Sequence, residues 1–231
     1  MVEYNVIVLA AGQGKRMNAG KNKQFIELLD EPLIIHTLKK FIQDSWCQHI
    51  YLVINPTEQQ QMQQLLAKYT WNNHVTFVDG GQERQESGYK GLLAVKPEEQ
   101  ERIIMIHDGA RPFVNEEHLH KLARAATQKK AALLAVPVTD TIKRKNGDNV
   151  ETVDRSTLWA AQTPQAFQYD LIKRAHEKAI SANFLGTDDV SLVEALEEPV
   201  EIVEGTYQNV KLTTPEDIMR AEMILNRQEE N

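Results

Sequence analysis

Short runs of β-branched and apolar residues alternate along this chain with longer segments whose apolar residues recur at helical spacing. This alternation is typical of βαβ units, in which parallel strands are joined by helices that pack on the sheet. We expect strands at 4–10, 49–54, 75–79, 102–107, 132–138 and 200–204, and helices at about 31–41, 57–69, 83–95, 116–128, 169–180, after 187 and from 214 onward. The sequence therefore predicts an α/β fold with a mostly parallel, twisted sheet flanked by helices.

The segment from about 139 to 157 interrupts this pattern. Charged residues and a turn at Gly147 separate two short extended pieces, 141–145 and 149–153, which resemble a polar hairpin. Elsewhere no linker-like stretch marks a boundary between domains. We therefore expect residues 1–231 to form a single domain from which a β-arm projects.

The charge balance and the cysteine count exclude several classes of protein. The chain has 33 acidic and 26 basic residues, a net charge of −7, which argues against general binding to nucleic acid or to anionic membranes. Its one cysteine, Cys47, cannot form an internal disulfide and fits a reducing compartment. Neither a positively charged leader nor an uncharged apolar stretch of about 18 residues is present. We expect a cytoplasmic protein that does not span a membrane.

A basic loop that contains two glycines follows the first strand. Gly12 and Gly14 are accompanied within a few positions by four cations: Lys15, Arg16, Lys21 and Lys23. Ligands of open parallel sheets bind beyond the carboxyl ends of the strands, where glycine lets backbone N–H groups converge on phosphate oxygens. The alternative is a solvated turn whose glycines merely allow positive φ. The glycine spacing is not the Walker pattern, and Met17 replaces the third glycine of a dinucleotide fingerprint, so a nucleoside triphosphate is favoured.

Asp108 stands at the end of the fourth predicted strand, just before Gly109 and Arg111. A carboxylate that faces a phosphate-binding loop suits Mg²⁺, which commonly takes one or two protein carboxylates together with phosphate oxygens and water. We predict that Asp108 binds Mg²⁺. The alternative is that Asp108 pairs with Arg111 or caps the turn. The neighbouring His107 is expected to be packed or hydrogen-bonded rather than catalytic.

Seven short motifs occur in order along the chain. They are LAAGQGKRM at 9–17 with KQ at 23–24, GGQERQES at 80–87, HDGARP at 107–112, DTIK at 140–143, TVDR at 152–155, QTPQ at 162–165 and GTDD at 186–189. Together they resemble the 2-C-methyl-D-erythritol 4-phosphate cytidylyltransferase family from residue 4 to about 225. The resemblance implies a Rossmann-like nucleotidyltransferase fold and a reaction in which CTP and methylerythritol phosphate give CDP-methylerythritol and pyrophosphate.

The resemblance also implies roles for the matching residues. Catalysis is expected from Arg16, Lys23 and Lys211. The CTP-binding positions are Ala10, Ala11, Gly12, Gly14, Lys15, Gly81, Ser87, Asp108 and Gly109, and Asp108 is also the Mg²⁺ ligand. The second substrate is expected to meet Arg111, Thr141, Arg155 and Thr187. Arms of this family embrace a dimer partner, so the chain is expected to be a homodimer that exchanges its arms.

Some of these positions have a second interpretation. Arg155 could form an exposed salt bridge with Asp154, and 187–189 is also a good helix N-cap with acidic residues in its first turn. Gln82 and Gln208 stand where some relatives carry acidic residues, so neither receives a role.

Three alternative functions remain open. The first is a ribitol-5-phosphate cytidylyltransferase, which shares the CTP loop but tends to lack the 152–155 and 186–188 patterns. The second is an NAD-dependent oxidoreductase, which Met17 and the basic loop disfavour. The third is a nucleotide-binding regulator without catalytic activity.

Overall fold

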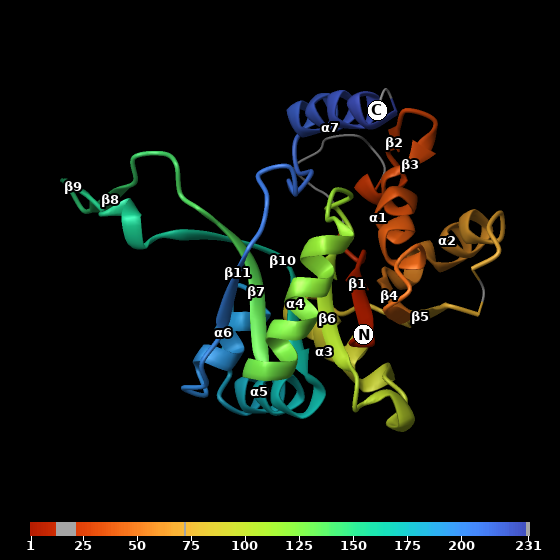
Figure 1. Cartoon of the computed structure of the whole chain (residues 1–231), viewed down its shortest axis with the longest axis horizontal. Helices are drawn as coiled ribbons and strands as arrows, with labels where there is room; N and C mark the ends of the chain where they lie inside the picture. The colour runs from red at the N-terminus through yellow and green to blue at the C-terminus, as the bar shows by residue number, and fades with distance from the viewer. Residues whose placement is uncertain (13–21, 72, 230–231) are drawn as a thin grey trace.

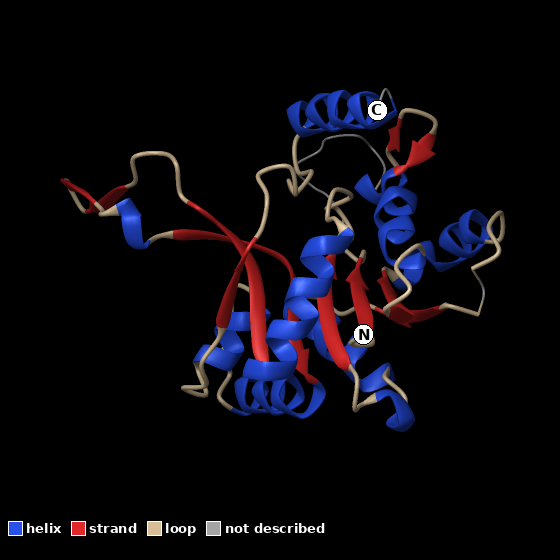
Figure 2. Cartoon of the chain, in the orientation of Figure 1, coloured by secondary structure: helices blue, strands red, loops and turns tan. Residues whose placement is uncertain are grey.

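The computed structural model describes residues 1–12, 22–71 and 73–229 of the chain. In this part of the protein, a seven-stranded sheet has the order β11-β7-β10-β6-β1-β4-β5 (Figures 1 and 2). Its strands are β1 (Tyr4–Leu9), β4 (Cys47–Ile54), β5 (Val75–Asp79), β6 (Ile103–Asp108), β7 (Ala131–Pro137), β10 (Trp159–Gln168) and β11 (Glu201–Glu204). Neighbouring strands run parallel except where β10 pairs with β6 and β7. The predicted mostly parallel α/β sheet is confirmed.

Helices cover both faces of this sheet. One apolar cluster contains residues of α1 (Leu33–Ile42), α2 (Gln59–Leu66) and α4 (Glu116–Lys129), and a second contains residues of α3 (Arg84–Ala94), α5 (Tyr169–Ser181) and α6 (Asp189–Glu194). The last helix, α7 (Pro215–Glu229), packs with the short hairpin of β2 (Glu27–Leu28) and β3 (Glu31–Pro32). No helix within the described ranges combines the length and the apolar character needed to cross a lipid bilayer.

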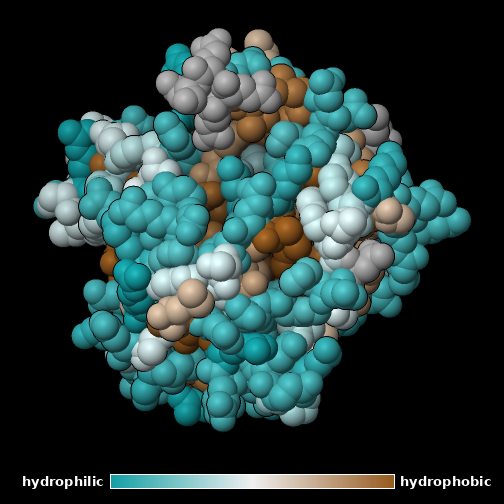
Figure 3. Space-filling view, turned by 45° about the vertical axis from the view of Figure 1, so that its right-hand side comes forward, coloured by the Kyte–Doolittle hydropathy of each residue, from teal (hydrophilic) through white to brown (hydrophobic). Residues whose placement is uncertain are grey.

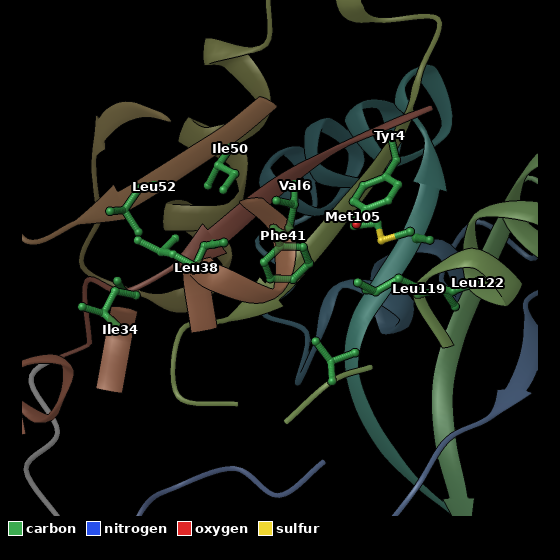
Figure 4. Packing of buried hydrophobic residues seen from close by; sticks show 14 of the residues in the cluster. Tyr4, Val6, Ile34, Leu38, Phe41, Ile50, Leu52, Met105, Leu119 and Leu122 are labelled. Atoms are coloured by element: carbon green, nitrogen blue, oxygen red, sulfur yellow. The ribbon is translucent and has the colours of Figure 1, made fainter. Parts of the chain in front are cut away.

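The central strand β1 is buried on both faces because its apolar residues form a continuous run. Val6 points into the cluster that includes Leu38 and Phe41 of α1 (Figure 4), whereas Ile7 belongs to the cluster on the opposite face. A strand covered on both sides is expected in a parallel sheet whose crossover helices lie on both faces. The parallel arrangement brings the carboxyl ends of β1, β4, β5 and β6 to one edge of the sheet.

One strand of the central sheet, β10, was not predicted from the sequence. This strand contains Gln162, Thr163, Pro164 and Gln165, and proline and polar residues argue against a central strand. Its pairing with β7 shifts register between Ala161 and Gln165, which accommodates the segment. The buried side chains have partners elsewhere, because Gln165 Oε1 accepts hydrogen bonds from the backbone N–H groups of residues 189 and 190. Hydrogen bonds to distant segments thus stabilise β10 although its own residues have a low propensity for a strand.

The other predicted elements agree with the structure to within a few residues, with two exceptions. The helix expected from residue 31 begins at Leu33, because Glu31 and Pro32 form β3. The helix expected at 57–69 consists of a 3-10 turn, Pro56–Glu58, followed by α2, which ends at Leu66. The predicted polar hairpin is observed as β8 (Lys143–Asn146) and β9 (Asn149–Thr152), a separate two-stranded sheet that extends away from the body in Figure 1.

Helix α3 packs very closely on β1 at Gly91. A Cβ atom at this position would lie 2.4 Å from Cγ2 of Ile7 and 3.2 Å from Cγ2 of Val53. We predict that Gly91→Ala lowers the free energy of unfolding by about 1–3 kcal/mol, the usual cost of overpacking a core, despite the better helix propensity of alanine. Urea titration of both proteins tests this, and a stabilised variant would contradict the close packing.

Candidate active site

A cavity opens at the edge of the sheet where β1 and β6 end. Residues that the sequence analysis singled out line it from distant parts of the chain: Ala11, Gly12, Lys23, Gly81, Ser87, Asp108 and Lys211. A second cavity adjoins the first and shares Ala11, Gly12, Gly81 and Gln82 with it. The face of the molecule in Figure 3 is mainly hydrophilic, with apolar side chains visible in recesses between the polar ones. The structure therefore brings most of the predicted CTP-binding residues together.

Lys23 reaches the cavity because a short capped turn holds it there. It is the first residue of a 3-10 turn, Lys23–Phe25, which Asn22 caps by accepting a hydrogen bond from the backbone N–H of Gln24 at 3.1 Å. Gln24 and Phe25 are buried, and Asn22 donates to Glu58 at 2.6 Å. Its neighbours are fixed in this way, and Lys23 lines the cavity.

One part of the cavity is formed mainly by backbone and small side chains. The N–H of Gly80 donates to Ile54 O at 2.7 Å, and the N–H of Gly81 donates to Oγ of Ser87 at 3.0 Å. A Cβ atom on Gly80 would lie 2.4 Å from Cβ of Ala11, so the turn after β5 lies directly against the segment after β1. The backbone thus fixes the Ser87 hydroxyl beside Gly81, and the charged side chains of Glu86 and Lys90 line the neighbouring cavity.

Asp108 lies among cationic side chains at the end of β6. Of the residues that the structure describes, Arg84 Nε lies 3.4 Å from Oδ1, while Lys211 Nζ and Arg111 Nε lie 2.9 Å and 3.6 Å from Oδ2. Burial raises the pKa of Asp108, but Arg84 and Lys211 outweigh it and hold this pKa well below its usual range. The alternative pairing with Arg111 is observed as one part of a larger cluster.

His107 helps to fix the end of β6. It is fully buried, and burial lowers its pKa to about 4, so the ring is neutral near pH 7. Nε2 donates to Arg111 O at 3.0 Å, and Nδ1 lies 3.2 Å from Oγ1 of Thr163, which accepts the Asp108 N–H at 3.0 Å. The prediction that His107 is packed or hydrogen-bonded agrees with these contacts.

Lys211 belongs to a loop that is tied to the same strands. Its neighbour Asn209 donates to Thr163 O at 2.9 Å and to Gln162 Oε1 at 3.2 Å, while the Asn209 carbonyl accepts from Arg111 Nη1 at 2.7 Å. The backbone N–H of Leu212 donates to Ala110 O at 2.9 Å. The loop thus places Lys211 beside Asp108, which is about a hundred residues away in sequence.

The remaining predicted residues lie outside this cavity or next to it. Ala10 is buried at the end of β1, and the Gly109 N–H donates to Leu9 O at 2.9 Å. The exposed residues Thr141, Arg155 and Thr187 lie elsewhere on the surface, and Arg155 donates to Thr139 O. The predicted positions Gly14, Lys15 and Arg16 lie outside the described residues.

The second interpretations given above for 187–189 and for Arg155 have different outcomes. Asp188 is the N-cap of α6, because its side chain accepts the Ser191 N–H at 3.0 Å and Ser191 Oγ lies 3.4 Å from the Asp188 N–H. The helix-cap interpretation of 187–189 is therefore confirmed. The predicted partner of Arg155, Asp154, instead accepts the backbone N–H of Ser156 at 3.0 Å, so the salt-bridge interpretation of Arg155 was wrong.

Two residues that organise the site, Arg84 and Thr163, were given no role from the sequence. Arg84 was quoted within the 80–87 motif, and Thr163 within the 162–165 motif. An arginine in the first turn of a helix opposes the helix macrodipole, and this unfavourable placement was a signal that anionic partners lie nearby. The position of Thr163 carried no comparable signal, because its role depends on the register of the missed strand β10.

The residues at this edge of the sheet offer little for a metal ion by themselves. Asp108 supplies one carboxylate, and cations already surround it. Among the described residues, one cluster has three possible ligands within 4.8 Å of one another, Asp44, Glu116 and His120. It lies near the start of β1, where Tyr4 donates to Asp44 at 2.7 Å. Hydrogen bonds from Tyr4, Trp46 and His120 occupy both oxygens of Asp44.

The arrangement is chemically suited to a polyanion. Cations converge at the carboxyl edge of the sheet, in a chain whose net charge is −7. Fixed cations of this kind stabilise phosphate groups and the charge that develops when they are transferred.

Comparison with known proteins gives one consistent result. The family model described as 2-C-methyl-D-erythritol 4-phosphate cytidylyltransferase matches residues 4–227. A protein of that name from Geobacillus thermodenitrificans (strain NG80-2) is 60% identical over 225 residues, which cover 97% of both chains. The protein of the same name from Bacillus velezensis is 53% identical over 100% of this chain and 99% of the relative.

Solved structures agree with these relatives. The crystal structure of 4-diphosphocytidyl-2C-methyl-D-erythritol synthase from Anaerococcus prevotii matches with a TM-score of 0.86 at 33% identity and covers 97% of this chain and 96% of that one. The 2-C-methyl-D-erythritol 4-phosphate cytidylyltransferase from Thermus thermophilus matches with a TM-score of 0.79 at 29% identity, over 97% of this chain and 100% of that one. With its site geometry, its motifs and these matches in agreement, the chain belongs to the 2-C-methyl-D-erythritol 4-phosphate cytidylyltransferase family.

Proposed function

We propose that this protein transfers the cytidylyl group of CTP to 2-C-methyl-D-erythritol 4-phosphate, giving CDP-methylerythritol and pyrophosphate for isoprenoid precursor synthesis. The observation that carries the proposal is the cluster of Lys211, Arg84 and Arg111 around Asp108, in a cavity that Lys23, Gly81 and Ser87 also line. Family membership points to the two substrates, and the cations of the cavity supply the positive charge that a bound triphosphate requires.

The reaction needs charge stabilisation rather than a general base. An oxygen of the sugar phosphate attacks the α-phosphorus of CTP, and the bond from that phosphorus to the pyrophosphate oxygen breaks. A phosphate monoester has a second pKa of about 6, so it is largely ionised at pH 7. Neutral, buried His107 is engaged by Arg111 O and Thr163 and is not needed to accept a proton.

The cations have separate tasks in this proposal. Lys23, together with Arg16, stabilises the negative charge that builds up around the α-phosphorus. Lys211, whose Nζ lies 2.9 Å from Asp108 Oδ2, helps to bring the two anionic substrates together. Lys15 and the backbone N–H groups of residues 12–14 bind the β- and γ-phosphates. Arg16, Lys15 and Gly14 receive these tasks by match to the family motif.

Mg²⁺ fits this site when a triphosphate supplies most of its ligands. The ion prefers octahedral oxygen ligands and usually keeps several waters, and Asp108 offers a carboxylate that its cationic neighbours keep ionised. When bound, the ion would neutralise phosphate charge. Before the triphosphate binds, the surrounding cations disfavour a lone metal, so we expect metal and nucleotide to bind together.

The part of the cavity beside Ala11 and Ser87 is proposed to select a pyrimidine base. Gly80 lies so close to Ala11 that a Cβ atom on Gly80 would clash, so the segments after β1 and β5 are held together in one fixed arrangement. The hydroxyl of Ser87 accepts the Gly81 N–H, so its own hydrogen is available to a base acceptor. Fixed backbone groups discriminate between bases by size and by hydrogen-bond polarity.

The second substrate is proposed to bind between Arg111 and residues from exposed segments, Thr141, Arg155 and Thr187. All residues of β8 and β9 are exposed, and an isolated two-stranded hairpin is marginally stable in water. Both facts support a homodimer in which each arm docks on the partner and brings Arg155 to the partner's site. A cytoplasmic location stays a prediction from the sequence.

We predict that Arg155→Ala raises the KM for methylerythritol phosphate by about tenfold or more and leaves CTP binding within about twofold. The reason is the loss of a charge-assisted hydrogen bond, worth about 1.5–3 kcal/mol. Steady-state kinetics with each substrate varied provide the measurement. Arg144→Ala is the matched control, because Arg144 lies in the same arm and pairs with exposed Glu151 at 2.8 Å. An equal rise in the KM values of both substrates would refute a role of Arg155 in binding methylerythritol phosphate alone.

A pyrophosphate-release assay tests the proposed function. CTP, UTP and ATP are each combined with methylerythritol phosphate or ribitol 5-phosphate, with and without Mg²⁺. The expected result is rapid release with CTP, methylerythritol phosphate and Mg²⁺. Preference for ribitol 5-phosphate would establish the sister activity, and binding of CTP without release would indicate a regulator.

A further inference from the structure

Arg84 connects the carboxylate of the proposed active site to a second, buried carboxylate. Its Nε lies 3.4 Å from Asp108 Oδ1, and its Nη1 donates to Asp189 Oδ2 at 2.7 Å. The Asp189 side chain is 1% exposed. His176, fully buried on α5, places Nε2 3.5 Å from the other oxygen of Asp189. One guanidinium thus bridges the end of β6 and the start of α6.

The position of Arg84 is unfavourable unless these anions are present. It is the first residue of α3, where the positive end of the helix macrodipole repels a cation. Burial lowers the pKa of Arg84, but Asp189 and Asp108 outweigh burial and raise this pKa above its usual value. Two carboxylates therefore hold the guanidinium in place. The Asp108 side chain is 10% exposed and the Asp189 side chain is 1% exposed.

Gln85, the residue after Arg84, binds the segment that precedes α6. Gln85 Nε2 donates to Phe184 O at 3.1 Å, and Gln85 Oε1 accepts the Gly186 N–H at 2.9 Å. Arg84 and Gln85 therefore bind both ends of the segment 184–189 in which Thr187 lies. Arg84 at the same time contacts Asp108, so the first turn of α3 links this segment to the nucleotide cavity.

We propose that Arg84 is a positioning residue that holds Asp108 and the 184–189 segment in the relative placement that the transfer reaction needs. The inference rests on the proposed function, because it concerns alignment of the CTP side and the sugar-phosphate side of one site. A planar guanidinium can serve two carboxylates at once, whereas a lysine ammonium on its flexible stem serves them less well.

Arg84→Ala is expected to lower kcat by about 10- to 100-fold, since small misplacements of reacting groups cost up to about 10²-fold in rate. The KM for methylerythritol phosphate is expected to rise more than the KM for CTP, because Lys211 and Arg111 still hold Asp108 while Asp189 loses its shortest contact. Arg84→Lys should recover part of the loss.

A double-mutant comparison separates positioning from independent effects. Asp189→Asn should reduce kcat by a factor similar to that of Arg84→Ala, and the double variant should lose much less than the product of the two factors. Arg174→Ala is the matched control, because it removes an arginine that pairs with Glu198 at 2.7 Å on the surface. Its kinetics should equal those of the wild type.

Hydrogen exchange gives a readout that does not depend on turnover. The backbone N–H groups of residues 189–191 are hydrogen-bonded to Gln165 and Asp188, and their exchange should accelerate in Arg84→Ala. Unchanged exchange in Arg84→Ala would overturn the inference. So would an Arg84→Ala protein that melts at a lower temperature but keeps the wild-type kcat and KM. A double variant whose loss of kcat equals the product of the two single losses would also overturn it. A wild-type protein that releases no pyrophosphate would refute the proposed function instead, while the exchange result would still decide the role of Arg84.

Discussion

Lys23→Ala is expected to lower kcat by about 10² to 10³, the usual cost of losing one preorganised charge at a transition state. Lys23 lines the cavity from a turn that Asn22 caps and that Gln24 and Phe25 anchor in the interior. Truncating its side chain removes a charge and leaves that turn in place. The KM for CTP should change much less than kcat, because the charge acts mainly on the transition state.

Steady-state pyrophosphate release at saturating CTP and methylerythritol phosphate measures this effect. Lys121→Ala is the matched control, since Lys121 pairs with Glu117 at 2.6 Å on the exposed side of α4. Turnover of Lys23→Ala within about threefold of wild type would show that Lys23 does not act on the reacting phosphate.

Asp108→Asn is expected to abolish most Mg²⁺-dependent turnover, again by about 10² to 10³. The substitution keeps the size of the side chain but removes the anion that faces Arg84, Lys211 and Arg111. The proposed Mg²⁺ would lose its carboxylate ligand, and metal ions contribute several kcal/mol of charge stabilisation in such reactions. CTP binding without Mg²⁺ should be retained or become tighter, because the site gains positive charge.

Calorimetric titration of CTP with and without Mg²⁺, together with the turnover assay, tests both parts of this prediction. Asp170→Asn is a suitable control, because Asp170 lies exposed in the first turn of α5. If Asp108→Asn kept wild-type turnover at every Mg²⁺ concentration, Asp108 would have no role in metal binding or catalysis.

The order of strands and helices could be predicted because each element carries its own pattern. The run at 4–10 and the helical spacing of 116–128 identify β1 and α4 without knowledge of their neighbours. β10 lacks such a pattern, since Gln162 and Gln165 are stabilised by hydrogen bonds to residues 206 and 188–190. Contacts between segments that are distant in sequence leave no periodicity to detect.

The same distinction applies to the site. The carboxylate of Asp108 after a strand and the glycine-containing basic loop are local features, and they indicated a phosphate site. The contacts of Asp108 with Arg84 and Lys211 join positions 24 and 103 residues apart in the chain, so spacing cannot reveal them. The family resemblance gave Lys211 a role in catalysis but not its contact with Asp108, and the roles of Lys211 and Arg84 beside this carboxylate required the three-dimensional structure.

The most direct test of the account follows an oxygen atom through the reaction. The phosphate of methylerythritol 4-phosphate is labelled with oxygen-18 at its non-bridging positions, and the products are examined by phosphorus-31 NMR. If the sugar phosphate attacks the α-phosphorus of CTP at this cationic site, the label appears in the bridge between the two phosphorus atoms of the product, and pyrophosphate carries none. Label in pyrophosphate, or an unlabelled bridge, would contradict the account.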